Sequence, residues 1–346
     1  MQEDGMQNEE RVALEVAVQN YITFHRMNNS SSDTINNYRY TLPRFVAWLS
    51  TNGVMYIDEL TLQHLRGFVV YLQGLLSQRD GEKLSDTTVQ QYAKHVLSFC
   101  HWMEEEDMLV KPITTKFKLP RAEKRLIVAL TSDDIDKLLL ACEEGDDRKP
   151  RLKKALTARN RAILIVSIDT GIRRKELVSL RLCDIDPVLN VLTIHRKGNT
   201  WQQVPISREA FKELHSYLKK HRPYLASLGG ATVTRKEDAV FLTHEGKPIT
   251  RIGVTVVFSF LARRSGIDDK RVYHHQCRRY MATTQLAMGR SPLDVQRQMG
   301  HTTLTMTNHY ASLTVEHLRQ SHEEYSPLRA KDKLKDGQKR NGYWDE

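Results

Sequence analysis

A basic stretch interrupted by prolines, residues 110–130, divides the chain into two differently patterned parts. Its sequence, VKPITTKFKLPRAEKRLIVAL, holds two prolines and six basic residues against one acidic residue. Helical spacing of apolar residues fails here, because proline lacks the amide N–H and restricts the residue before it. Such a stretch is typical of an extended linker, and its charge suits either a path along a phosphate backbone or solubility alone. We therefore expect two domains, which a chain of 346 residues also favours by length.

The part before this stretch has the pattern of a helical bundle. Apolar residues such as Leu42, Phe45 and Leu49 recur at spacings that place them on one face of a helix. Similar stripes before and after them, separated by polar breaks, indicate four or five helices of ordinary length. The expected segments of the whole chain are a polar tail (1–11), a helical first domain (12–108), a basic linker (109–130), a second domain (131–325) and a charged tail (326–346).

The second domain mixes helices with a small β-hairpin. Thr131 or Ser132 is expected to cap a helix with acidic residues in its first turn. A later apolar helix should end at Gly171, and the segment 190–207 alternates like two strands joined at Gly198 and Asn199. The fold class predicted for the chain is therefore mainly α, with a small β-sheet or hairpin in the second of two domains.

The net charge and the composition limit the class of partner that this chain can bind. Lys and Arg outnumber Asp and Glu by 52 to 42 and the pI is about 9.3, which favours a polyanion such as nucleic acid. No apolar run is long enough to span a membrane, and the acidic start resembles no signal peptide, so a cytoplasmic, nucleoid-associated protein without a membrane partner is expected. The four cysteines are widely scattered, which predicts buried free thiols rather than disulfides or a zinc site.

Basic and histidine residues concentrate in short segments of the second domain. These segments are DTGIRRKEL (169–177) with Arg173, the hairpin tip with Lys197, the run with His275 and Arg278 at helical spacing, and GHTTLTMTNHY (300–310) with His301 and Tyr310. An arginine held by a turn can present its planar fork to two phosphate oxygens. Taken alone, however, each of these residues is more often structural or exposed to solvent than catalytic.

The order and spacing of these segments resemble the boxes of the tyrosine recombinase family, which includes the phage integrases. The matching residues are Thr170-Gly171-Ile172-Arg173-Arg174-Lys175-Glu176-Leu177, Lys197 in the hairpin, His275-Gln276-Cys277-Arg278, and Gly300-His301 followed nine residues later by Tyr310. The departures from the family pattern are Cys277, Arg279, Tyr280 and Met299, which are expected to pack near the site. The helical N-terminal part is similar to the family's core-binding domain in pattern only.

A mechanism follows from the residue types. No carboxylate cluster suited to magnesium appears near these boxes, so no metal or other cofactor is expected, and Arg173 and Arg278 should neutralise the scissile phosphate. His301 can donate a further hydrogen bond to it. Tyr310 is suited to act as the nucleophile. Because a phenol has a pKa near 10, its oxygen is also a fair leaving group when the phosphate is later transferred back to a DNA strand.

The resemblance implies the remaining steps. Attack by Tyr310 gives a 3′-phosphotyrosine link and a free 5′-hydroxyl, with His275 accepting the phenolic proton and Lys197 protonating the departing oxygen. The implied partners are double-stranded DNA with inverted-repeat sites, further copies of the chain in a tetramer, and accessory DNA-bending proteins. The resulting activity is site-specific integration, excision or resolution of a mobile element or replicon.

Three other interpretations stay open at the level of sequence. A type IB topoisomerase would use the same chemistry as a monomer, without strand exchange. An architectural DNA-binding protein would keep the basic surface without cleavage. A metal site of His274, His275 and Cys277 is the least favoured, because adjacent residues project in different directions from a helix.

Overall fold

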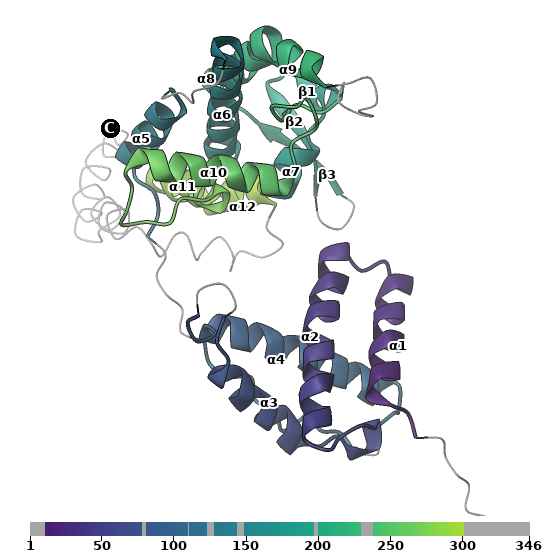
Figure 1. Cartoon of the computed structure of the whole chain (residues 1–346). Helices are drawn as coiled ribbons and strands as arrows, with labels where there is room; N and C mark the ends of the chain where they lie inside the picture. The colour runs from purple at the N-terminus through teal and green to yellow at the C-terminus, as the bar shows by residue number, and fades with distance from the viewer. Residues whose placement is uncertain are drawn as a thin grey trace, which may run out of the picture. The chain divides into compact units, whose positions relative to one another are not determined.

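The chain folds into two compact units, Met1–Leu126 and Ile127–Glu346. The computed structural model describes residues 11–77, 81–109, 111–122, 128–143, 149–196, 200–229 and 238–300 (Figure 1). The division between the units falls inside the stretch that the sequence predicts as a linker. No helix in these described ranges is long and apolar enough to cross a membrane.

The first unit is a bundle of helices. The elements are α1 (Leu14–Met27), α2 (Ser32–Thr51), a 3-10 turn η1 (Ile57–Glu59), α3 (Leu62–Gly74) and α4 (Asp86–Glu105). Ser31 and Ser85 begin α2 and α4 as N-caps, each accepting a hydrogen bond from a backbone N–H three residues on. Phe45, Phe68 and Phe99 are fully buried between the helices. The predicted helical bundle is confirmed, and burial of one apolar face of each helix holds it together.

The predicted linker is in part a component of this first unit. The Glu104 carboxylate on α4 accepts hydrogen bonds from the backbone N–H groups of Ile113 and Thr114, at 2.6 and 2.8 Å. Ile113 and Phe117 pack against the apolar core. Residues 111–120 therefore pack on the first unit instead of running free as a linker. The Glu104 carboxylate satisfies backbone N–H groups of this segment, and its apolar side chains are partly buried against the core.

The second unit contains most of the described elements. They are α5 (Ser132–Glu143), α6 (Pro150–Thr170), α7 (Arg174–Ser179), η2 (Leu182–Asp184), β1 (Ile185–Asp186), β2 (Val191–Arg196), β3 (Thr200–Pro205), α8 (Arg208–Ser216), a π-helical turn η3 (Tyr217–His221), α9 (Arg222–Leu228), α10 (Arg251–Ser265), α11 (His274–Ala287) and α12 (Pro292–Met299). Helix α6 packs against α5, α8, α9 and α11. Figure 1 shows it in the middle of the unit. The helix begins at Pro150, earlier than the apolar run suggests, because proline is favoured in the first helical turn.

The sheet has three antiparallel strands in the order β1-β2-β3. Leu192, Ile194 and Arg196 occupy the buried positions of β2, as the period of two requires. The β2–β3 hairpin pairs Arg196 with Thr200, so the predicted hairpin is confirmed; the loop 197–199 lies outside the described residues. Strand β1 was not expected from the sequence, because two residues are too few to show alternation.

The cysteines follow the prediction with one exception. Cys100, Cys142 and Cys277 are free and buried, whereas Cys183 is free and exposed. Cys183 lies in the short turn η2 at the surface, where Asp184 is the buried residue, and this explains the difference.

Gly171 is constrained both by its backbone conformation and by its neighbours. It ends α6 in the left-handed conformation with φ of 63°, and a Cβ atom there would overlap the Cε atom of Met281. Gly266 ends α10 with nearly the same conformation, φ of 65°, but faces open space. Gly171 therefore meets two demands, a backbone conformation and a close approach to α11.

We expect Gly171→Ala to lower the free energy of unfolding by about 2–4 kcal/mol, from about 1 kcal/mol of backbone strain and about 1–3 kcal/mol of overpacking. Gly266→Ala is the matched control and should cost only about 1 kcal/mol, because it carries the backbone strain alone. Chemical denaturation of both variants measures the difference. Equal losses would show that Met281 moves aside without cost.

Candidate active site

The structure describes three of the six predicted catalytic residues. These are Arg173, His275 and Arg278. Lys197, His301 and Tyr310 lie outside the described residues, as does all that follows Gly300. The described part of the site comprises the two arginines, the histidine and the chain that ends at Gly300.

Arg173 is held by the turn between α6 and α7. Gly171 ends α6, and Arg173 is the N-cap residue of α7. The carboxylate of Glu176 accepts from the backbone N–H of Arg173 at 2.7 Å and from its guanidinium at 3.0 Å. Glu176 is buried, whereas the Arg173 side chain keeps 38% of its surface exposed. Glu176 thus orients Arg173, as its place one turn along the helix suggests.

Arg278 and His275 start from the same helix, α11, but face different surroundings. Arg278 is 1% exposed, and its guanidinium donates to the carbonyls of Gly171 and Met299, each at 2.5 Å. His275 is exposed in the first turn of α11. The two residues are three positions apart on the helix and start close together. The Arg278 side chain turns inward and bridges α6 and α12.

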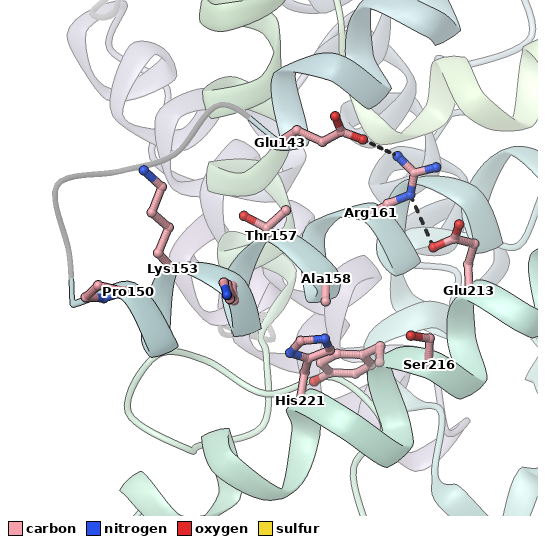
Figure 2. Close-up of a pocket in the computed structure, with 11 residues that line it drawn as sticks. Glu143, Pro150, Lys153, Thr157, Ala158, Arg161, Glu213, Ser216 and His221 are labelled. Atoms are coloured by element: carbon pink, nitrogen blue, oxygen red, sulfur yellow. Dashed lines mark hydrogen bonds and ion pairs between the residues drawn. The ribbon is translucent and has the colours of Figure 1, made fainter.

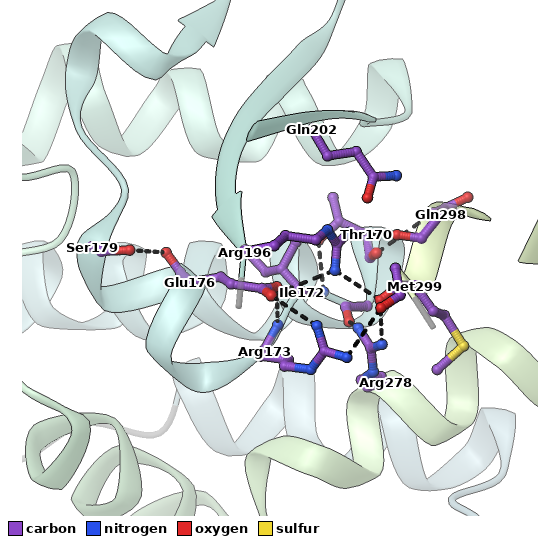
Figure 3. A network of polar contacts seen from close by, with 12 residues as sticks. Thr170, Ile172, Arg173, Glu176, Ser179, Arg196, Gln202, Arg278, Gln298 and Met299 are labelled. Atoms are coloured by element: carbon purple, nitrogen blue, oxygen red, sulfur yellow. Dashed lines mark hydrogen bonds and ion pairs between the residues drawn. The ribbon is translucent and has the colours of Figure 1, made fainter. Parts of the chain in front are cut away.

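The carbonyl groups at the end of α12 gather donors from several elements (Figure 3). Arg196 on β2 donates to the carbonyl of Gln298 at 2.6 Å and to that of Met299 at 2.7 Å. Arg173 donates to the carbonyl of Gly300 at 3.4 Å, and Gln202 on β3 donates to that of Arg297 at 2.6 Å. The last carbonyls of a helix have no partner within the helix and carry its negative dipole end, so cations suit them well. The chain entering residue 301 is consequently fixed among arginines.

Gln298 adds a second tie between α12 and α6. Its amide nitrogen lies 3.4 Å from the Thr170 carbonyl, and its side-chain oxygen accepts from Arg290. The residue is only 6% exposed. The end of α12 and the end of α6 are therefore joined by side-chain hydrogen bonds as well as by Arg278.

Arg196 is the residue that the sequence analysis missed. It is 6% exposed and shares its face of β2 with Leu192 and Ile194. A charged residue at an inward position of a strand needs partners, and this is the signal that could have identified it. Burial lowers the pKa of its guanidinium below the ordinary arginine value, and the nearby Glu176 carboxylate opposes that shift.

The two neighbouring histidines of α11 differ in kind. The pKa of His275 is lowered, first by partial desolvation of its ring and then by the positive charges of Arg278, Arg279 and Arg173. It is therefore neutral near pH 7 and able to accept a proton. Burial lowers the pKa of His274 to about 3, and its Nε2 lies 3.2 Å from the Ser167 hydroxyl, which makes it a neutral core residue.

The departures from the family boxes are packing positions. Cys277 and Met299 are fully buried, Arg279 is 5% exposed, and Tyr280 packs against the core. Within the described ranges, no group of three or more His, Cys, Asp or Glu side chains is placed to hold a metal ion.

A separate cavity of about 490 Å³ lies between α5, α6, α8 and η3 (Figure 2). Its wall includes Lys153, His221 and Arg161, and Arg161 forms ion pairs with Glu143 and Glu213 at 2.9 and 3.2 Å. Arg173, Glu176, Arg196 and Arg278 are not among the residues that line it. The cavity is therefore distinct from the candidate active site.

The arginine network brings three guanidinium groups and one carboxylate to the place where the chain enters residue 301. Arg173, Arg196 and Arg278 converge on the end of α12, and Glu176 lies between the first two. Such a cationic cluster is suited to an anionic group whose charge grows during a reaction, as on a phosphate being displaced.

The chain is similar to known recombinases over most of its length. It is 27% identical over 298 residues to "Tyrosine recombinase XerD" of Listeria innocua, covering 86% of this chain and 93% of that protein. It is also 27% identical over 315 residues to "Tyrosine recombinase XerC" of Oceanobacillus iheyensis, covering 91% of this chain and 97% of that protein.

Solved structures share its fold. The XerH site-specific recombinase bound to palindromic difH substrate matches with a TM-score of 0.65 at 18% identity, covering 90% of this chain and 84% of that one. The lambda integrase tetramer bound to a Holliday junction matches with a TM-score of 0.63 at 15% identity, covering 87% and 78%. At these identities the likeness concerns the fold, and the predicted mainly helical, two-domain class with a small sheet is confirmed.

The model of the phage integrase family matches residues 129–317, more than half of the chain. This range contains every box that the sequence analysis compared with that family. The chain therefore belongs to the phage integrase family and is a tyrosine recombinase.

Proposed function

We propose that this protein is a site-specific DNA recombinase that cuts and rejoins strands through a 3′-phosphotyrosine intermediate. The observation that carries the proposal is the convergence of Arg173 and Arg278, two residues of distant boxes, on the chain that enters His301. Their meeting at one place in the fold is what a single reaction centre requires. In this centre the arginines neutralise the nonbridging oxygens of a phosphate, and His301 donates a hydrogen bond to it.

The remaining roles go to three residues. Tyr310 attacks the phosphorus atom and His275 accepts the phenolic proton, which its lowered pKa supports because the neutral ring is the proton acceptor. Lys197 gives a proton to the departing 5′-oxygen. The bond energy stays in the phosphotyrosine ester, so the 5′-hydroxyl of a partner strand can reverse the step and seal a new connection.

The proposed partners are double-stranded DNA with inverted-repeat sites and three further copies of the chain. Strand exchange joins two duplexes, and each inverted-repeat site takes two subunits, so four active sites meet in one complex. The lambda integrase that shares this fold was solved as a tetramer on a Holliday junction. Accessory DNA-bending proteins are further proposed partners, the compartment is the cytoplasm, and the substrate is a mobile element or replicon.

A plasmid assay tests strand exchange. The target is first selected from random-sequence duplexes by binding, and two copies are placed in one supercoiled plasmid. We expect deletion products when the copies are in direct orientation and inversion products when they are in opposite orientation. A plasmid with a single copy is the control and should give neither product.

Two results would overturn the proposed function. A ladder of topoisomers without rearrangement would indicate a type IB topoisomerase. Retained binding with neither relaxation nor rearrangement would indicate an architectural DNA-binding protein.

A further inference from the structure

Arg196 lies at the centre of the arginine network, although it belongs to none of the boxes that define the site. Its NH1 group donates to the Met299 carbonyl at 2.7 Å and lies 3.4 Å from Glu176 Oε1, while its NH2 group donates to the Gln298 carbonyl at 2.6 Å. One planar fork thus bridges β2, α7 and α12. Lysine could not replace it, because a single ammonium on a flexible stem cannot hold three acceptors in fixed directions.

Gly300 confirms how closely α12 approaches this side chain. Gly300 has φ of 60°, and a Cβ atom there would lie 2.7 Å from Arg196 Cδ and 2.8 Å from its Cζ. Both contacts are too short for a carbon atom. The last residue described before His301 is thus seated directly on the Arg196 guanidinium.

Glu176 connects the same side chain to Arg173. The Glu176 Oε1 atom accepts from Arg173 at 3.0 Å and from Arg196 at 3.4 Å, and the side chains of Glu176 and Arg196 are 4% and 5% exposed. A carboxylate shared by two cations in a buried place is held more firmly than one facing solvent. Any displacement of Arg196 therefore acts on both Arg173 and the end of α12.

We propose that Arg196 is a positioning residue for strand cleavage, which fixes the end of α12, and with it the start of the segment carrying His301, against the carboxylate that holds Arg173. It does not touch the substrate. The inference rests on the proposed function, because it assigns Arg173 and His301 to the phosphate. A displacement of about 1 Å at such groups can slow a reaction about 100-fold.

The test compares Arg196→Met and Arg196→Lys in a single-turnover cleavage assay. The substrate is the selected duplex with a nick next to the cleavage site, so that the cut strand dissociates and the covalent complex accumulates. At saturating DNA we expect Arg196→Met to cleave about 100-fold more slowly, with DNA affinity within about 3-fold of wild type. Arg196→Lys should fall between the two, because it keeps the charge but loses the fork. It also serves as the test if the Met variant does not fold.

Gln202→Ala is the matched control. Gln202 also donates to a carbonyl at the end of α12, but it is neutral, contacts the carbonyl of Arg297 there, and comes from the neighbouring strand β3. Its loss should slow cleavage by no more than about 3-fold, since one neutral hydrogen bond at a surface contributes little net free energy. Cleavage by both Arg196 variants within about 3-fold of wild type would overturn the inference.

A substrate with sulfur in place of the bridging 5′-oxygen separates two routes of action. A thiolate leaves without a proton, so it removes the need for Lys197. We expect the defect of Arg196→Met to persist on this substrate, because the residue acts through the end of α12. Recovery to the wild-type rate would overturn the inference and show that Arg196 acts through the hairpin that carries Lys197.

Hydrogen exchange supplies a readout that does not depend on activity. The amide of Gly300 bonds to the carbonyl of Arg297 at 3.0 Å, and we expect it and its neighbours in the last turn of α12 to exchange faster in Arg196→Met, with exchange in α6 unchanged. Unchanged exchange at the end of α12 would overturn the inference. If wild-type protein forms no covalent complex, the proposed function fails, while this measurement still decides whether Arg196 fixes the helix end.

Discussion

Tyr310→Phe is expected to abolish covalent protein–DNA complexes while leaving DNA affinity within about 3-fold of wild type. The substitution removes one phenolic oxygen, which is the atom proposed to attack phosphorus. Loss of a nucleophile costs roughly 10⁴-fold or more in rate, because no nearby group replaces it. Binding depends instead on many contacts between cations and phosphates, which the variant keeps. Denaturing electrophoresis of protein mixed with labelled, nicked duplex measures the complex, and a mobility shift measures the affinity.

Tyr280→Phe is the matched control for this variant. Tyr280 lies on α11 within the same domain and packs partly against the core. The same loss of a phenolic oxygen there should leave covalent complexes at the wild-type level. Complexes that persist in Tyr310→Phe would exclude the proposed nucleophile, and complexes lost in Tyr280→Phe alone would reassign it.

Arg278→Lys is expected to slow cleavage by about 10²–10³-fold, the scale seen when one group that stabilises developing charge is removed. Lysine keeps the charge but replaces a planar fork by a single ammonium. The fork also holds the carbonyls of Gly171 and Met299, so the variant loosens α6 and α12 together. A carbonyl left without a donor costs about 1–3 kcal/mol, and thermal unfolding should show this loss.

Arg290→Lys separates catalysis from stability. Arg290 donates to the side chains of Gln285 and Gln298 and thus also supports α12, but it belongs to no box of the family. We expect a small loss of stability and cleavage within about 5-fold of wild type, since each of these part-buried hydrogen bonds contributes about 1 kcal/mol and lysine keeps a donor. If Arg278→Lys cleaves as fast as Arg290→Lys, Arg278 is a structural residue and the proposed role is wrong.

The fold could be predicted where a local signal decides the local structure. Gly171 ends a helix because only glycine readily takes its conformation, and the alternating segments on either side of residues 197–199 pair as the two strands of a hairpin. The packing of the segment 111–120 could not be predicted, because its position depends on Glu104, a residue on another element. Its two prolines indicated that the helix stops, but not what the chain packs against afterwards.

The candidate site divides in the same way. Arg173 and Arg278 were singled out through their boxes, but their spacing did not reveal that Arg278 would be buried and bound to backbone carbonyls. Arg196 was missed because an arginine next to a predicted catalytic lysine resembles one more surface cation. The alternation of β2 places it on the same face as Leu192 and Ile194, but the sequence does not show that its partners are the carbonyl groups of α12. The predicted roles of Lys197, His301 and Tyr310 stay predictions.

The length of helix α12 is fixed by the residues at its two ends. Ser291 caps its start and Gly300 ends it in the left-handed conformation, so its eight residues are fixed at both ends. Adding or deleting one residue would turn everything beyond the helix by about 100° and shift it by about 1.5 Å along the axis. Single-residue insertions within α12 should therefore be tolerated far less well than insertions in exposed loops, and length variation among natural relatives should avoid this helix.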